Sequence, residues 1–453
     1  MPTQSGTGED GIAATGGRIA TLARLPGLGA WTAWRWQRAG RHAEALALLD
    51  RAGIARLRLR SLFALDLHRP FLDVLGTAEP RGWQIAARGL ARLAVGELDL
   101  ACGDLAEASS GAPRFGLWLR AASALAQIDK EQAKRLLEPK RHAAPAALLL
   151  SHLAERAGDA GRAAHYSPRL NGRRAAETDL LAANIALLGG DAGGAKAAAG
   201  RAFARYGLSP ADAPCAETGG PLVSIVVAAY NAQSSIETSV ASLARQSWRQ
   251  VEIVVVDDAS SDATAERVAA MAETDARIRV LRQQSNEGAY VARNAGVAAA
   301  RGAFVAFHDA DDIAHPARIA RQIAPLLHDE TLAFTTARWA RRTDGGAFRS
   351  RQIAPLIRQH VGSFLVRRDA LGKAGPFDPV RFGADGEMLL RLQVAAGPRG
   401  YRALDQLLTI GGWDARSAVH DDKTGYGERG FSLARLEYRE TATWRLIRRL
   451  QGR

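Results

Sequence analysis

Three carboxylates follow an apolar run in the second half of the chain. Residues 304–308 read Phe-Val-Ala-Phe-His, and Asp309, Asp311 and Asp312 occupy three of the next four positions. A strand of this kind delivers its last side chains to the edge of a sheet, where neighbouring carboxylates can hold a divalent cation through hard oxygen ligands. Such a cation could carry a diphosphate. The cluster is also compatible with a solvated turn or a helix cap.

Polar residues also follow two earlier apolar runs. Tyr230 follows residues 222–229, and Asp257 and Asp258 follow residues 251–256. Two adjacent carboxylates repel each other unless they face different partners, such as a base amide or ribose hydroxyl and a helix N-terminus. The pattern therefore indicates that a bound group or a helix end lies beside them.

These runs are the strands that must position the polar side chains. Strands are predicted at 222–229, 251–256, 278–281 and from 304, and helices at 235–246, 263–273 and 288–300. Continuous Val and Ile runs that alternate with helices are typical of a parallel sheet covered on both faces. Ligands bind beyond the carboxyl ends of such strands, so the polar residues should meet at one edge. His308 should only shape its strand end, since successive side chains face opposite ways.

The first half of the chain has a different texture. Ala, Leu and Arg recur with helical spacing, and the following pairs repeat at steps of 32, 30 and 32 residues: Glu97 with Ala101, Asp129 with Ala133, Asp159 with Ala163, and Asp191 with Ala195. A period in the low thirties favours stacked helix pairs, loosely similar to tetratricopeptide repeats. An irregular helical domain is the alternative.

The composition shifts divide the chain into five segments. We expect a disordered N-terminus at 1–17, an all-α domain at 18–208, a linker rich in Pro and Gly at 209–220, an α/β domain at 221–440 and a basic tail at 441–453. In the tail region, arginines alternate with apolar residues. This pattern predicts either a helix lying on the inner membrane surface or a closing helix packed on its own domain.

The second half resembles the family 2 glycosyltransferases of the GT-A fold, the nucleotide-diphospho-sugar transferases with a Rossmann-like, mostly parallel sheet. The resemblance covers about residues 221–440 and rests on the order of Tyr-Asn, Asp-Asp-x-Ser-x-Asp, Asn-x-Gly, Ala-Arg-Asn and Asp-x-Asp-Asp. It implies that the nucleotide sugar is bound by Tyr230, Asp257, Asp258, Arg293 and Asp309. It also implies that Asp309 and Asp311 hold Mg or Mn.

The resemblance further implies a general base in the acceptor half. Asp385 aligns with that base, although Ala384 replaces the acid that often precedes it, and Ala228 and Ala229 replace a Pro and a hydroxyl residue before the Tyr-Asn pair. A helix cap is the structural alternative for Asp385. A late histidine completes metal coordination in some GT-A enzymes, and His420 is the candidate here, in a stretch that is also compatible with a solvated loop.

Composition limits the other classes of function. The 453 residues are 47% hydrophobic and 24% charged, which indicates a soluble globular protein of two or more domains, and no apolar run reaches the roughly 18 residues of a membrane span. The polar, acidic start predicts a cytoplasmic protein, peripheral at the inner membrane if the C-terminal helix lies there. A net charge of +13 favours anionic partners, but no basic run interleaved with aromatics indicates a nucleic-acid site.

The resemblance implies a metal-dependent inverting glycosyltransferase. It would move a sugar from a nucleotide-sugar donor, a UDP-sugar, to a glycan or lipid-linked acceptor in bacterial surface or capsular polysaccharide biosynthesis. Two alternatives are a sugar nucleotidyltransferase and a non-catalytic scaffold that binds protein partners through its helical repeats.

Overall fold

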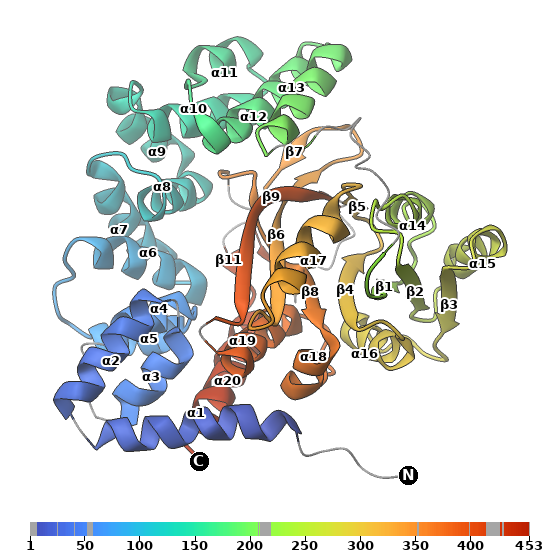
Figure 1. Ribbon diagram of the computed structural model, residues 1–453. Coiled ribbons are helices and arrows are strands. Elements are labelled where there is room, and N and C mark those ends of the chain that lie inside the picture. Colours follow the sequence, from blue (N-terminus) through green and yellow to red (C-terminus); the bar gives the residue numbers. More distant parts are fainter. Residues whose placement is uncertain are drawn as a thin grey trace.

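The computed structural model describes residues 7–24, 26–39, 41–51, 58–206, 208, 219–350, 353–397, 399–413, 426–427 and 430–452 (Figure 1). Every regular element described before residue 207 is a helix. Its elements are α1 (Thr7–Ala23), α2 (Pro26–Arg38), α3 (His42–Arg51), α4 (Leu59–Ala64), α5 (His68–Leu75), α6 (Trp83–Val95), α7 (Leu98–Ser110), α8 (Leu117–Ile128), α9 (Lys130–Leu137), η2 (Glu138–Lys140), α10 (Ala144–Arg156), α11 (Ala160–Tyr166), η3 (Gly172–Arg174), α12 (Ala175–Leu188) and α13 (Ala192–Ala204).

The repeat read from the sequence marks the starts of α7, α9, α11 and α13. Asp129, Asp159 and Asp191 are the N-cap residues of α9, α11 and α13, and each side chain accepts a hydrogen bond from the backbone N–H three residues later, at 2.7–2.8 Å. Glu97 holds the same position before α7 without a side-chain cap. The alanines four residues on are all buried, and each of these helices packs against the helix before it. Stacked helix pairs are therefore present, while their assignment to the tetratricopeptide class stays a prediction.

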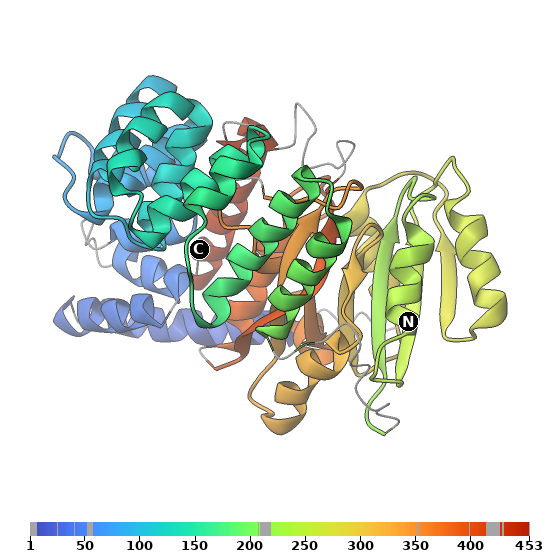
Figure 2. The same cartoon turned by 90° about the horizontal axis from the view of Figure 1, so that it is seen from above.

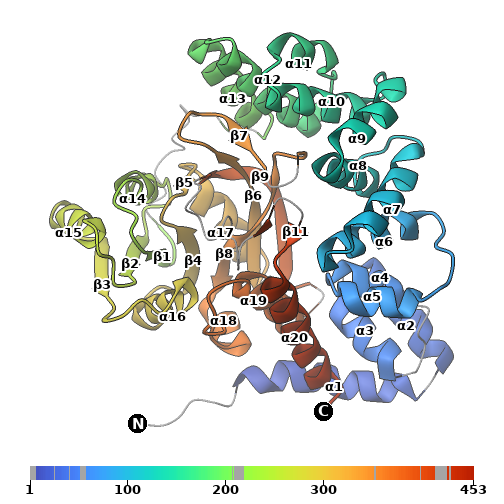
Figure 3. The same ribbon diagram turned by 180° about the vertical axis from the view of Figure 1, so that it is seen from behind.

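The helix pairs form an arc around the second half of the chain, as Figures 1 and 3 show from opposite sides. That half contains the strands and the remaining helices. Its elements are β1 (Val223–Ala229), α14 (Ile236–Ala244), β2 (Val251–Asp257), α15 (Thr264–Thr274), β3 (Ile278–Arg282), α16 (Ala289–Ala299), β4 (Phe304–Asp309), β5 (Ile313–Ala314), α17 (Arg318–His328), β6 (Phe334–Arg342), β7 (Phe348–Arg349), β8 (Arg358–Arg367), α18 (Arg368–Ala374), α19 (Ala384–Ala396), β9 (Tyr401–Gly412), β10 (Tyr426–Gly427), β11 (Gly430–Phe431) and α20 (Leu433–Leu450).

One sheet runs through this half in the order β3-β2-β1-β4-β8-β6-β9-β5, with β7 paired to β6. The first four strands are parallel, as the continuous Val and Ile runs predict, and their inner strands are buried along almost their whole length. From β8 onward the sheet is mixed: β8 is antiparallel to β4 and β6, whereas β9 is parallel to β6. The sheet is therefore parallel in its first half and mixed in its second.

The last helix corrects the expected C-terminal boundary. A separate basic tail was expected at 441–453, but α20 runs without a break from Leu433 to Leu450, across the expected boundary at 441. Its apolar residues Leu446, Ile447 and Leu450 share a hydrophobic core with α1 and α3. The Gln451 carbonyl also accepts a hydrogen bond from Arg51 at 2.6 Å. The helix therefore closes the fold against the N-terminal region, and its apolar face is not free for a membrane.

The first helix corrects the N-terminal boundary in the same way. Disorder was expected through residue 17, but α1 begins at Thr7. Ile19 is fully buried, and Leu22 packs against the same core that holds the end of α20. The polar, Gly-rich sequence of this segment does not by itself predict a helix. The helix is stabilised by packing against this distant partner.

The helical arc also clamps the segment that joins β6 to β8. Seen from above, α12 and α13 lie across that side of the sheet (Figure 2). Asn184 donates to the Phe348 carbonyl at 2.8 Å and accepts from the Phe348 N–H at 2.6 Å. Glu177 accepts from the N–H groups of Leu356 and Ile357, and Glu155 pairs with Arg349 at 2.8 Å. These contacts join the helical region to the sheet of the second half.

A close approach between α16 and the sheet explains one glycine of the Ala-Arg-Asn-Ala-Gly stretch. A Cβ added at Gly296 would lie 2.4 Å from Val226 Cγ1 and 3.2 Å from Val256 Cγ2. We expect Gly296→Ala to lower the free energy of unfolding by about 1–3 kcal/mol, because the helix must move away from the sheet.

Gly200 provides the matched control, since it is also helical and a Cβ there meets nothing within 4 Å. Gly200→Ala should be neutral or stabilise by up to about 1 kcal/mol. Urea unfolding followed by circular dichroism measures both variants, and equal stability of the two would contradict the packing argument.

Candidate active site

The strand register brings the predicted polar residues to one edge of the sheet. β1 lies between β2 and β4, with Ala229 opposite Asp257 on one side and Ala228 opposite Asp309 on the other. Tyr230 continues from β1 at this edge and is 51% exposed. The loop that follows is fixed to the next one, since the N–H of Asn231 donates to Ser260 Oγ at 2.9 Å. The carboxyl ends of the parallel strands thus meet as expected.

The two adjacent aspartates have different surroundings. Asp258 accepts hydrogen bonds from the N–H groups of Glu287 at 2.9 Å and Gly288 at 2.8 Å, one on each oxygen. It therefore holds the loop that begins α16. Asp257 is equally buried, but within the described residues its Oδ1 has no hydrogen-bond partner. Of the pair, Asp257 therefore has a buried carboxylate oxygen that a ligand could satisfy.

An ion pair joins α16 to the end of β4. Arg293 is 4% exposed, and its Nη2 lies 2.5 Å from Asp309 Oδ1. Burial works against its charge, but Asp309, Tyr290 and Asp385 together raise the pKa of Arg293. The guanidinium also lies over the rings of Tyr290, Phe307 and Phe377, at 5.4–6.0 Å. Arg293, the arginine predicted to bind the nucleotide, is thus a buried cation held in place by Asp309 and by three aromatic rings.

Tyr290 connects this ion pair to Asp385. Its hydroxyl donates to Asp385 Oδ1 at 3.2 Å and accepts from the N–H of Gly383 at 3.1 Å. Burial, and then the charge of Asp385, raises the pKa of Tyr290, so the hydroxyl keeps its proton. Asp385 lies in the first turn of α19, where the helix dipole favours a carboxylate. Asp385, Tyr290, Arg293 and Asp309 therefore form one continuous chain of contacts.

A candidate metal centre lies beside this chain. One ligand atom from each of Asp309, Asp312 and His360 lies within 4.8 Å of the other two. A helix cap was one alternative for the carboxylate cluster, but Ala317 is the N-cap of α17, and Asp312 is 2% exposed and lies beside His360. Its Oδ2 lies 4.0 Å from His360 Nε2 and has no hydrogen-bond partner among the described residues.

The electrostatics of these side chains suit a hard divalent cation. Burial, and then Asp309 and Asp311, raises the pKa of Asp312 well above its ordinary value, because three carboxylates crowd one place. Burial, followed by nearby arginine charges, lowers the pKa of His360 well below its ordinary value, so the ring is neutral. In the tautomer that donates from Nδ1 to Ser363 Oγ at 2.6 Å, Nε2 presents its lone pair to the cluster. Two carboxylates and an imidazole fit Mg or Mn.

Asp311, the other predicted metal ligand, occupies the open side of the cluster. It is exposed, and a Cβ added at Gly412 would lie 2.6 Å from its Oδ2. Arg341 lies between the rings of Trp339 and Trp413, and its charge acts on Asp311 and Asp312. His420 lies outside the described residues.

His308 supports the strand end from the opposite face, as predicted. Its Nδ1 lies 2.7 Å from Arg318 Nη1, and its Nε2 lies 3.2 Å from the carbonyl of Asp312. Arg318 is fully buried and also donates to the carbonyls of Phe307 and Ser363. This network fixes β4 and β8 relative to each other, which places Asp312 beside His360.

His360 is the residue that sequence reasoning missed. It lies in β8, whose sequence Arg-Gln-His-Val-Gly-Ser-Phe-Leu-Val-Arg carries no acidic neighbour or metal motif. The one available signal is the Val-Gly-Ser-Phe-Leu-Val run, which marks a strand. That β8 pairs antiparallel with β4 depends on the fold and is not encoded in this stretch of sequence.

Part of the second half is similar in sequence to known proteins. Residues 224–390 match the sequence model of the glycosyl transferase family 2. The succinoglycan biosynthesis protein ExoO of Rhizobium meliloti (strain 1021) is 46% identical over 103 residues, which are 23% of this chain and 29% of that protein. The UDP-Glc:alpha-D-GlcNAc-diphosphoundecaprenol beta-1,3-glucosyltransferase WfgD of Escherichia coli is 39% identical over 106 residues, 23% of this chain and 41% of its own length.

The chain spans less than half of the length of these curated relatives. Among solved structures, S. aureus TarS 1-349 is 20% identical, with a TM-score of 0.35 over 42% of this chain and 60% of its own. The order of the motifs, the strand topology and the match together identify residues 224–390 as a glycosyl transferase family 2 domain of the GT-A fold, joined to an all-helical N-terminal region.

Proposed function

We propose that this protein is an inverting glycosyltransferase that moves a sugar from a nucleotide-sugar donor to a glycan or lipid-linked acceptor. The observation that carries the proposal is the chain of contacts from Asp385 through Tyr290 and Arg293 to Asp309. It joins a carboxylate of the acceptor half to the carboxylates at the nucleotide edge. A non-catalytic scaffold would not require these groups to lie together.

Asp385 is the proposed general base. Its Oδ1 accepts hydrogen bonds from Tyr290 and Gly386, whereas Oδ2 accepts none within the described residues. In the proposed step, Oδ2 takes the proton of the acceptor hydroxyl as its oxygen bonds to the anomeric carbon. The bond from that carbon to the diphosphate breaks on the opposite face, and the nucleoside diphosphate leaves. Attack from the opposite face inverts the anomeric centre.

The nucleotide edge supplies the donor site. We assign the free oxygen of Asp257 and the exposed ring of Tyr230 to the nucleoside, with Asp258 holding the loop around it. Asp309, Asp312 and His360, with Asp311 on the open side, would hold Mg or Mn, which supplies Lewis-acid stabilisation of the diphosphate when bound. The name of the relative WfgD supports a UDP-sugar as donor.

The biological setting follows from the relatives and is also a proposal. ExoO is named for succinoglycan biosynthesis, which supports a role in bacterial surface or capsular polysaccharide assembly on the cytoplasmic side of the inner membrane. Across the described residues, every helix is too short or too polar to cross a membrane. The helical arc would serve as the site for a protein partner or for the acceptor.

We expect Asp385→Asn to lower the transfer rate about 10²- to 10⁴-fold while the KM for the donor stays nearly unchanged, because the amide keeps the shape but cannot take the proton. Screening purified protein against nucleotide sugars, with released diphosphate as the readout, identifies the donor for this assay. Asp369→Asn, an exposed carboxylate in the first turn of α18, is the control. An undiminished rate in Asp385→Asn would remove this residue from the mechanism.

We expect Mn²⁺ to bind the protein, and Asp312→Asn and His360→Gln each to weaken binding by about tenfold or more, since each removes one ligand. The electron paramagnetic resonance signal of free Mn²⁺ measures the affinity without any substrate. Asp344→Asn removes one carboxylate from the exposed turn between β6 and β7 and should change nothing. Unchanged affinity in both site variants would place the ion elsewhere.

A further inference from the structure

Helix α2 presents an unusual stripe of side chains to solvent. Trp31 is 52% exposed and Trp34 is 49% exposed. Arg35 and Arg38 are also exposed, and the spacing 31, 34, 35 and 38 puts all four on one face of the helix. In a globular protein this spacing normally marks the face that packs inward. Here the large aromatic residues of the stripe face outward.

The opposite face of α2 shows that this orientation is fixed. Ala33 is fully buried, Trp36 packs against the hydrophobic core shared by α1, α3 and α20, and Gln37 donates to Ser61 Oγ at 3.0 Å. Rotating the helix to bury the stripe would break these contacts. The exposed tryptophans are therefore part of the native packing.

Each tryptophan of the stripe contacts an arginine guanidinium through a cation–π interaction. The Arg35 guanidinium lies 4.8 Å from the centre of the Trp31 ring, and that of Arg38 lies 5.0 Å from the Trp34 ring. Within the described residues neither arginine pairs with a carboxylate, so both charges stay available to an anion. Tryptophan rings are common at the headgroup level of a bilayer, where basic side chains also meet lipid phosphates. Exposed tryptophans beside unpaired arginines therefore suit such an interface.

We propose that the stripe of Trp31, Trp34, Arg35 and Arg38 docks the protein on an anionic lipid surface. This differs from the membrane helix expected at the C-terminus, because the apolar face of α20 is buried whereas that of the α2 stripe is open. A carbohydrate would need bare ring faces to stack on, and here a guanidinium already covers one face of each ring. The free charges favour a phosphate-bearing surface.

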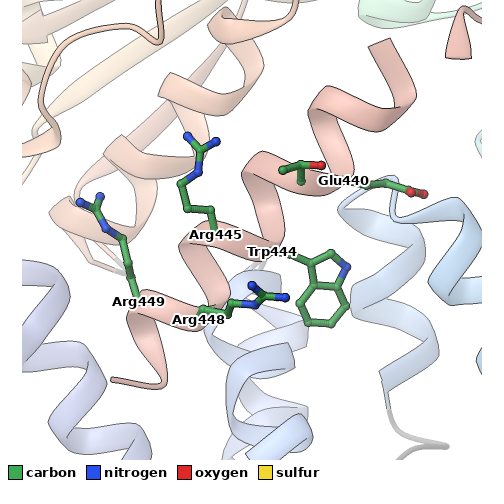
Figure 4. A pocket seen from close by; sticks show the side chains of 6 residues that line it. Glu440, Trp444, Arg445, Arg448 and Arg449 are labelled. Atoms are coloured by element: carbon green, nitrogen blue, oxygen red, sulfur yellow. The ribbon is translucent and has the colours of Figure 1, made fainter. Parts of the chain in front are cut away.

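Further positive charge lies at the same end of the molecule. Figures 1 and 3 both show α1, α2 and the C-terminal end of α20 there, and α1 packs against the other two. A pocket of about 460 Å³ on α20 contains one carboxylate and three arginines, and its lining is Glu440, Thr441, Trp444, Arg445, Arg448 and Arg449 (Figure 4). Arg445 pairs with Asp378, but Arg448 and Arg449 have no carboxylate partner in the described chain. These charges add to the attraction of an anionic surface.

Flotation of the full-length protein with vesicles tests the proposal. We expect binding to phosphatidylcholine vesicles that contain phosphatidylglycerol, weak binding to pure phosphatidylcholine, and a loss of binding at high salt. Trp31→Ala with Trp34→Ala, and separately Arg35→Glu with Arg38→Glu, should each weaken binding by about tenfold or more.

Two matched controls separate this surface from general effects. Leu100→Ala with Leu188→Ala removes exposed apolar side chains elsewhere on the helical arc, and Arg114→Glu with Arg135→Glu makes the same charge change there. Neither should alter binding. Equal binding of the α2 variants and these controls, or equal binding to both kinds of vesicle, would overturn the proposal. Donor turnover in solution should be unchanged in all four variants, so a failure of lipid binding is distinct from a failure of the proposed transferase.

Discussion

The arrangement of the site depends on one buried cation. Arg293 is almost fully enclosed by the rings of Tyr290, Phe307 and Phe377, and a guanidinium in such surroundings is costly unless a carboxylate meets it. Asp309 meets it at 2.5 Å, which fixes α16 to the end of β4. Because Tyr290 belongs to the same helix and also bonds Asp385, the ion pair sets the distance between the two halves of the site. The other contacts of the pocket are built outward from this pair.

The strands of the nucleotide half could be predicted because each one is marked by its own short stretch of sequence. Its strands are parallel and buried on both faces, so they read as continuous Val and Ile runs, and the observed bounds of β1, β2 and β4 lie within a residue or so of the expected ones. The acceptor half gave no such signal. Strand β6 carries Thr, Trp and Arg among its apolar residues, so it has no continuous Val and Ile run. His360 and the true position of Asp312 depend on how β8 pairs with β4, which no short stretch of sequence encodes.

The helical half shows the same division between local and distant causes. The caps at Asp129, Asp159 and Asp191 act within one turn, so their spacing revealed the helix pairs directly. Both ends of the chain were misjudged because their stability comes from each other: α1 and α20 share a core although more than four hundred positions separate them in sequence.

The contact between Asn184 and Phe348 has a consequence for how this protein can be divided. The side-chain amide bonds both the N–H and the carbonyl of a residue in β7, which is the way a neighbouring strand would bond it. The helical arc thus covers the outer rim of the sheet. A truncated chain without the arc would present β7 as an open template for another copy, and such rims recruit strands from other molecules. The helical arc therefore protects this edge of the second half against such pairing.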